Sequence, residues 1–205
     1  MSFFENTRRP VGLGGKIMLA MMNLGHSPVA RWGLQFLELA PDAKVLDCGC
    51  GGGANIKRLL KKCPEGIVKG IDYSPVSAEK SKKVNEAAIA EGRCTVLQGS
   101  VADMMFADNW FDAVTAFETV YFWPNLPQCF RVIYRVLKPG GTFLICNESS
   151  GDTDKDEKWT EIIGGMTIYS GDELKTFLEN AEFCNVQIHK NKMGWLCVTG
   201  QKREE

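Results

Sequence analysis

Short runs of β-prone apolar residues alternate with longer segments of helical periodicity over most of the chain. Strands are predicted at 45–47, 67–71, 94–98, 111–117 and 142–147, and helices at 53–62, 76–90, 126–137 and 172–181. This alternation favours an α/β fold with a mostly parallel sheet. Two final apolar runs, 184–189 and 194–199, are joined by Lys190-Asn191-Lys192 and predict a closing antiparallel hairpin in which His189 faces solvent.

Residues 1–39 are predicted to form an N-terminal helical arm in front of a domain at 40–205. The segment 17–24 is rich in methionine, and methionine side chains often pack on surfaces that close over ligands. We therefore expect 17–24 to act as a lid. A second helix, beginning at Ser27-Pro28, is expected to pack in the core. His26, at the elbow between the two segments, is either a ligand contact or an exposed or capping residue.

The stretch from Lys44 to Gly53 contains a strand, a tight turn and the start of a helix. Four of the six residues after Asp47 are glycine. Because glycine has no Cβ, Gly49, Gly51 and Gly53 allow a positive φ and let a flat ligand approach the peptide groups. The next helix directs its unpaired N–H groups at the same space. The pattern indicates a nucleotide-like ligand, and the same glycine spacing also fits a dinucleotide-binding turn or a purely structural one.

Asp47, followed by Gly49, Gly51 and Gly53, resembles position for position the first motif of the class I S-adenosylmethionine-dependent methyltransferases, an acidic residue followed by G-x-G-x-G. The segment Leu-Lys-Pro-Gly-Gly at 137–141 also resembles a frequent signature of this family, where it makes a sharp helix exit before a strand. The resemblance implies a Rossmann-like seven-stranded sheet, mostly parallel with an antiparallel C-terminal hairpin, and helices on both faces. It also implies S-adenosyl-L-methionine as the cofactor.

A second acidic residue, Asp72, follows the strand at 67–71, at the spacing of a strand–helix–strand unit. A carboxylate there is suited to accept both hydroxyls of a ribose, and the resemblance places Tyr73 beside the adenine ring. Ser100 stands where the family usually has an acid that accepts the adenine amino group. Its hydroxyl can still accept, and the Val101 N–H can serve a ring nitrogen. The residues predicted to bind the cofactor are Asp47, Gly49, Cys50, Gly51, Gly53, Asp72, Tyr73, Ser100, Val101 and Phe117.

The strand at 111–117 leads into a segment that is acidic and then aromatic. Because ligands of doubly wound sheets bind beyond the carboxyl ends of the strands, Phe117 and Glu118 are expected to face the methionine part of the cofactor and its methyl group. The aromatic rings at 121–123 suit a sulfonium or an apolar acceptor, and one or two of them are expected to be ordinary core. If the acceptor requires a base, Glu118 and Tyr121 are the candidate catalytic residues.

Composition narrows the classes of partner. The chain has 205 residues and a formal net charge of −1, which fits one domain without a basic block for nucleic acid. Its eight cysteines are scattered, and Cys48, Cys94, Cys146 and Cys197 stand in apolar runs as expected of free thiols in a reducing cytoplasm. No metal site is predicted, because too few Cys and His residues cluster. The run at 17–24 is too short for stable membrane insertion or a signal peptide.

The function predicted from the sequence is transfer of a methyl group from S-adenosylmethionine to a small-molecule acceptor by in-line displacement. Two alternatives remain open. One is an NAD-dependent oxidoreductase, which the glycine spacing fits but for which no catalytic domain follows. The other is a non-catalytic module that binds S-adenosylmethionine.

Overall fold

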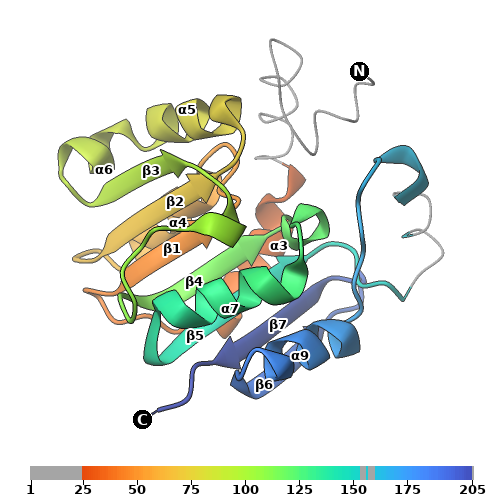
Figure 1. Cartoon of the computed structure of the whole chain (residues 1–205). Helices are drawn as coiled ribbons and strands as arrows, with labels where there is room; N and C mark the ends of the chain where they lie inside the picture. The colour runs from red at the N-terminus through yellow and green to blue at the C-terminus, as the bar shows by residue number, and fades with distance from the viewer. Residues whose placement is uncertain (1–24, 153–155, 157–159, 205) are drawn as a thin grey trace.

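One seven-stranded sheet organises the described part of the chain, in the order β3-β2-β1-β4-β5-β7-β6. The computed structural model describes residues 25–152, 156 and 160–204. The strands are β1 (Lys44–Cys48), β2 (Ile67–Asp72), β3 (Cys94–Gln98), β4 (Phe111–Phe117), β5 (Leu137–Asn147), β6 (Cys184–Lys190) and β7 (Leu196–Gln201). Strands β1 to β5 are parallel, and β7 runs antiparallel to both β5 and β6 (Figure 1). The predicted sheet and its C-terminal hairpin are confirmed.

Helices cover both faces of this sheet. They are α3 (Ser27–Gly33), α4 (Ala54–Lys62), α5 (Pro75–Val84), α6 (Glu86–Ala90), α7 (Leu126–Val136) and α9 (Gly171–Asn180). Figure 1 shows α7 and α9 in front of the sheet and α3 and α4 behind it. Side chains along β5 alternate between the two layers: Phe143 and Ile145 pack with α7 and α9, whereas Leu144 and Cys146 pack with α3 and α4.

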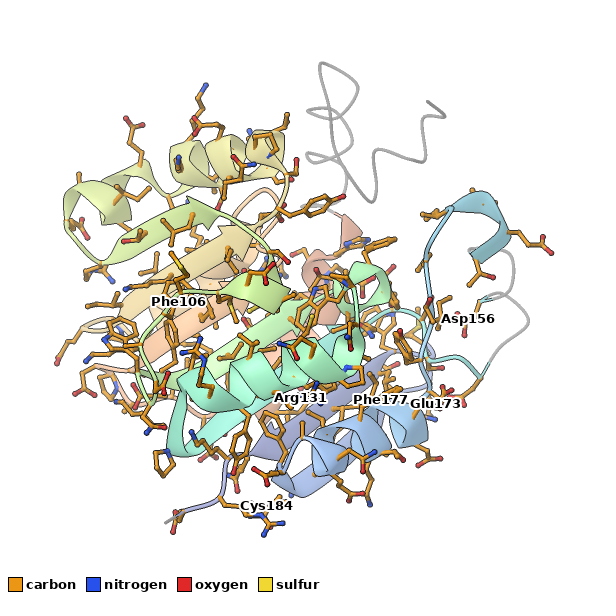
Figure 2. The ribbon with its side chains drawn as sticks, in the orientation of Figure 1. Phe106, Arg131, Asp156, Glu173, Phe177 and Cys184 are labelled. Atoms are coloured by element: carbon orange, nitrogen blue, oxygen red, sulfur yellow. The ribbon has the colours of Figure 1, made fainter. Side chains whose placement is uncertain are left out.

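The front layer is closed by the contact between α7 and α9. Figure 2 shows Arg131 of α7 and Phe177 of α9 next to each other where the two helices meet. Helix α9 begins at a capping box: Ser170 Oγ accepts from the Glu173 N–H at 3.2 Å, and Glu173 Oε2 accepts from the Ser170 N–H at 2.8 Å. This cap fixes where the helix starts and thus where it lies against β6 and β7.

Only part of the predicted arm falls within the described residues. The lid predicted at 17–24 lies outside them. The second helix is confirmed as α3, and it continues as a 3₁₀ turn at Leu34–Phe36. Gly33 packs against Cys146 of β5 so closely that a Cβ at this position would collide with its sulfur. Helix α3 is therefore held directly on the sheet.

Two element boundaries differ from the prediction. The predicted helix at 76–90 is broken at the buried Asn85, whose Nδ2 donates to the Gly53 carbonyl at 3.0 Å and to the Ser81 carbonyl at 2.9 Å. The segment 137–141, predicted to precede a strand, belongs to β5, because the Gly140 N–H donates to the Lys202 carbonyl at 2.9 Å. Gly140 has a positive φ of 75°.

The prediction that His189 faces solvent is wrong. Its ring stacks on Phe36, with 3.9 Å between centroids and 10° between planes, and it is half-buried. The hairpin is thereby joined to the segment after α3. The cysteine prediction holds: all eight are free, and Cys48, Cys94, Cys146 and Cys197 are buried. Within the described residues, no helix has the length and apolar character needed to span a bilayer.

Candidate active site

A cavity of about 420 Å³ opens at the carboxyl ends of the parallel strands. Its lining comes from the turn after β1, the ends of β2, β3 and β4, the start of α3, the first turns of α4, the segment 119–124 and residues 165 and 167. The lining includes Gly49, Cys50, Gly51, Asp72, Tyr73, Ser100, Val101, Phe117, Glu118 and Tyr121. The structure thus gathers ten of the twelve predicted site residues around one space and leaves out Asp47 and Gly53.

The three predicted glycines have three different roles. Gly51 has φ 50°, its N–H donates to Asp72 Oδ2 at 2.8 Å, and a Cβ there would meet no atom within 4 Å, so this peptide is open to the cavity. Gly49 has φ 73°, and a Cβ there would collide with the Thr119 side chain. Gly53 has φ 81° and faces α5, where a Cβ would lie 2.6 Å from Asn85 Nδ2. Gly53 is required for packing behind the turn.

Asp72 is fixed at the rim by two main-chain donors. Its Oδ1 accepts from the Ser74 N–H at 2.9 Å and its Oδ2 from the Gly51 N–H at 2.8 Å, and the side chain is 8% exposed. Burial raises the pKa of the Asp72 carboxyl, and hydrogen bonds from these two N–H groups and from the Ser77 side chain oppose the rise. A carboxylate has about four acceptor sites, which is more than these three donors occupy, so Asp72 can still accept from a ligand. Tyr73, 41% exposed, lines the cavity beside it.

Asp47 lies beneath the turn. It is 1% exposed, its Oδ1 accepts from Thr115 Oγ1 at 2.8 Å, and its Oδ2 has no hydrogen-bond partner among the described residues. Burial raises the pKa of Asp47 to about 7, while the Thr115 hydrogen bond lowers it and the charge of Asp72 raises it further. The carboxyl therefore exchanges its proton near neutral pH, and nearby positive charge would favour the ionised form.

Ser100 and Val101 form the wall beyond β3. Ser100 Oγ accepts from the Ala102 N–H at 3.2 Å and so caps the 3₁₀ turn at Val101–Asp103. One lone pair of the hydroxyl is thereby used within the protein. The predicted acceptor role of Ser100 rests on its remaining lone pair.

The segment after β4 supplies both acid and aromatic groups. Glu118 has φ 57°, an uncommon conformation for a residue with a side chain, and its Oε1 accepts from the Glu148 N–H. Burial and the charge of Glu148 raise the pKa of Glu118 well above its usual range, and hydrogen bonds from Glu148 and Tyr121 oppose this. The Tyr121 hydroxyl accepts from the Ser149 N–H at 3.1 Å, and burial raises its pKa.

All three predicted aromatic residues line the cavity. Tyr121 is 3% exposed, and Trp123 also stacks on Phe143 of the core, with 6.3 Å between centroids. The Trp123 Nε1–H donates to Thr119 Oγ1 at 3.0 Å, which holds the indole in place. The expectation that one or two of the rings belong to the core is met by Tyr121 and Trp123, which serve both surfaces.

Glu148 is a functional candidate that the sequence analysis missed. One ligand atom each from His26, Glu118 and Glu148 lies within 4.8 Å of the others, and His26 Nε2 is 4.0 Å from Glu148 Oε2. Burial raises the pKa of Glu148 and lowers that of His26. Among the described residues, this is the one His, Cys, Asp and Glu cluster with a geometry that could hold a metal ion, and it could equally exchange a proton. Glu148 directly follows the strand predicted at 142–147, which could have marked it.

A second group that sequence reasoning missed lies on α4. Asn55 and Arg58 face the cavity from the first turns of this helix. Arg58 Nη1 donates to Asn55 Oδ1 at 2.7 Å, and Nη2 donates to Ser27 Oγ at 2.6 Å. Their three-residue spacing after the glycine turn is a signal that places both on one helix face.

Comparison with known proteins agrees with this geometry. Residues 46–145 match the model of a family described as a methyltransferase domain. Sterol methyltransferase-like 2 of Botryococcus braunii is 34% identical over 150 residues, which cover 71% of this chain and 38% of that protein. The 24-methylenesterol C-methyltransferase 3 of Arabidopsis thaliana is 27% identical over 169 residues, covering 80% of this chain and 45% of that protein. The chain therefore spans less than half the length of these curated relatives.

Solved structures of low sequence identity share the fold. A methyltransferase from Aquifex aeolicus, described as SAM-dependent, has a TM-score of 0.73 at 18% identity, covering 91% of this chain and 96% of the other. Geranyl diphosphate C-methyltransferase from Streptomyces coelicolor, solved with Mg²⁺, geranyl-S-thiolodiphosphate and S-adenosyl-L-homocysteine, has a TM-score of 0.74 at 14% identity. That match covers 86% of this chain and 76% of the other.

Proposed function

Since the chain belongs to the class I S-adenosylmethionine-dependent methyltransferases, we propose that it binds S-adenosyl-L-methionine in this cavity and transfers the methyl group to a small-molecule acceptor. The observation that carries the proposal is the hydrogen bond from the Gly51 N–H to Asp72 Oδ2 at 2.8 Å. This hydrogen bond joins the glycine turn after β1 to the acid at the end of β2, so the two motifs that resemble the family's cofactor-binding segments meet at one edge of the cavity. The Asp72 carboxylate lines the cavity at this rim and suits ribose hydroxyls as donors.

The other residues that line the cavity suit different parts of the cofactor. Tyr73, Ser100 and Val101 form the wall near Asp72 and suit a flat purine ring. The bare peptides of Gly49 and Gly51 lead from there toward Phe117 and the aromatic segment at 121–123. Ring faces stabilise a sulfonium through their quadrupoles. Asp47, beneath the turn, adds a carboxylate whose ionised form is favoured when a cationic ligand binds.

The reaction supplied by this cofactor is a displacement at the sulfonium methyl carbon, in which the acceptor forms the new bond and the sulfur keeps the electron pair. The residues act mainly by holding the reacting atoms in line and by excluding water. If the acceptor atom carries a proton, Glu118 can take it, since its carboxylate lies at the cavity wall and its pKa is raised. Tyr121, which is close to Glu118, positions this carboxylate.

The part of the cavity that we assign to the methyl acceptor is lined mainly by apolar residues. Its apolar lining residues are Val29, Phe117, Phe122, Trp123 and Pro124. His26 and Glu118 form its polar end, and Glu148 lies next to them. One of the two curated relatives is named as a sterol methyltransferase-like protein and the other as a C-methyltransferase of 24-methylenesterol. We propose an apolar small molecule whose reacting end enters the cavity and faces Glu118.

Isothermal titration calorimetry with S-adenosylmethionine, S-adenosylhomocysteine and NADH tests the cofactor. Binding of both adenosyl ligands and no heat from NADH are expected. Binding of NADH alone would favour the oxidoreductase alternative and contradict the proposal. Transfer of a labelled methyl group across a panel of apolar acceptors then tests the enzyme, and cofactor binding without any transfer would favour the non-catalytic module.

A further inference from the structure

The turn between β6 and β7, residues 190–195, lies at the same edge of the sheet as the cavity. Strand β7 begins opposite the end of β5, because Leu196 pairs with Asn147. The cavity opens at the carboxyl ends of the parallel strands, to which β5 belongs. Helix α3, whose first turn lines the cavity, contacts the β6–β7 turn through Trp32 and Trp195, with 6.0 Å between ring centroids. One edge of the sheet therefore carries both the turn and the cavity.

This edge exposes apolar side chains to solvent. Met193, in the β6–β7 turn, is 72% exposed. Trp195, Trp32 and Phe36 are each half-buried, and the rings of Trp32 and Phe36 meet edge to face with 5.2 Å between centroids. Tryptophan combines an apolar ring with a polar N–H group, which suits it to the boundary between water and lipid. The edge has the apolar groups that a shallow membrane contact requires.

The same edge is basic. Helix α3 and the turn 190–195 contain three basic residues, Arg31, Lys190 and Lys192, and no acidic residue. Lys190 Nζ lies 2.6 Å from Asp152 Oδ2. Arg31 and Lys192 are exposed, and neither has a carboxylate within 4.0 Å over the ranges 25–152, 156 and 160–204. Two cations are therefore available to an anionic partner beside the apolar groups.

We propose that the β6–β7 turn and the outer face of α3 dock on the surface of an anionic phospholipid bilayer. Met193 and the two tryptophan rings lie at the boundary between head groups and acyl chains, and Arg31 and Lys192 meet lipid phosphates. Charge favours this occupant over a second copy of the chain, because two copies joined at this edge would bring like charges together.

Docking at this edge places the cavity next to the lipid. Helix α3 connects the two, since Val29 lines the cavity and Trp32 belongs to the docking face. Apolar molecules partition from water into bilayers, so an apolar acceptor is most concentrated where this edge is held. The inference goes beyond the proposed function, because the docking itself requires neither cofactor nor acceptor.

Co-sedimentation of the full chain with vesicles tests the docking. We would measure the apparent Kd for phosphatidylcholine vesicles with and without phosphatidylserine, at low and at high salt. The variants are Met193→Ser and Lys192→Gln, with Met105→Ser and Lys62→Gln as matched controls. Met105 is 98% exposed and follows Met104, whose carbonyl accepts from Arg135 in the last turn of α7, near the start of β5. Lys62 is exposed in the last turn of α4.

The wild type should bind vesicles that contain phosphatidylserine and should lose most of this binding at high salt or without the anionic lipid. Met193→Ser should weaken binding about tenfold, because the methionine no longer leaves water. Lys192→Gln should weaken it about fivefold. Both controls should bind like the wild type. No vesicle binding by the wild type, or losses no larger than those of the controls, would overturn the docking.

Light scattering tests the competing occupant. We expect a monomer at the concentrations used, and a dimer that Met193→Ser dissociates would assign this edge to a second copy and overturn the docking. Calorimetry with S-adenosylhomocysteine should give the same affinity for the wild type and Met193→Ser, which also verifies the fold of the variant. Vesicle binding by a chain that binds no S-adenosylhomocysteine would support the docking and contradict the proposed function, so the two fail separately.

Discussion

Glu118 accepts a hydrogen bond from the main-chain N–H of Glu148, so that the acids following the neighbouring strands β4 and β5 lie close together. Burial, aided by the charge of Glu148, raises the pKa of Glu118. Burial also raises the pKa of Glu148, so both acids gain or lose a proton at a higher pH than an exposed glutamate would.

For an acceptor that loses a proton on methylation, kcat should rise with pH as Glu118 ionises, through a pKa above the usual range of glutamate. Glu118→Gln keeps an oxygen for the Glu148 N–H but cannot take a proton. We expect it to lower kcat by about 100-fold and to remove this limb of the profile, while S-adenosylhomocysteine still binds. Glu65→Gln, at an exposed position, serves as the control. A Glu118→Gln profile that retains the wild-type limb would contradict the assignment.

Chelator treatment distinguishes proton exchange from metal binding at His26, Glu118 and Glu148. We expect methyl transfer to continue unchanged after EDTA, because displacement at a sulfonium leaves a neutral thioether and needs no Lewis acid. Titration with Mg²⁺ or Mn²⁺ should give no specific heat. Activity that is lost with EDTA, returns with Mn²⁺ and does not return in His26→Ala would instead identify a metal site.

Asp72→Ala should weaken S-adenosylhomocysteine by about 1 to 3 kcal/mol, because a buried pair of hydroxyls would lose its acceptor. The variant also leaves the Gly51 and Ser74 N–H groups without their carboxylate. Calorimetry of the variant against Asp103→Asn, an exposed acid in the 3₁₀ turn after β3, measures the difference. Affinity equal to the wild type would remove Asp72 from the cofactor site.

The stability of the free protein should depend on pH through Asp47. Its pKa is raised to about 7 in the folded protein from an ordinary value of 3.8. The folded state therefore holds an extra proton between these values, and this contribution to stability is present at low pH and is lost as pH rises toward 7. Asp47→Asn should flatten that part of the curve, which falls by on the order of 1 kcal/mol per pH unit at most. Urea unfolding at pH 5 and pH 8 provides the measurement, and identical pH slopes in the two proteins would disprove it.

Alanine substitutions at two glycines with positive φ measure the stability cost of backbone strain separately from the cost of lost packing. Gly92, at φ 74°, has open space where a Cβ would lie, with no atom within 4 Å, whereas a Cβ on Gly53, at φ 81°, would lie 2.6 Å from Asn85 Nδ2 and from Ser81 Oγ. Gly92→Ala should cost about 1 kcal/mol of unfolding free energy from conformation alone. Gly53→Ala should cost about 2 kcal/mol more, since α5 must move. Equal losses in urea unfolding would mean that Gly53 has no packing role.

Local sequence was sufficient for most elements and for much of the cofactor site. The glycine turn, the acid at the end of β2 and the Ser170–Glu173 cap are recognisable because each depends on backbone conformation over a few neighbouring residues. Even so, the three glycines looked equivalent in the sequence, and only the packing of Gly53 against α5 separates it from the cavity-facing Gly51.

What the sequence determined by itself is the succession of strands and helices and the position of the acids at strand ends, because periodicity and chain connectivity fix these. What only the tertiary structure decided is which distant side chains meet: Arg58 with Ser27, and His26 with Glu148. The break at Asn85 belongs to the same class, since it depends on the Gly53 carbonyl. Such contacts follow from how helices pack across the sheet, and no local pattern records that packing.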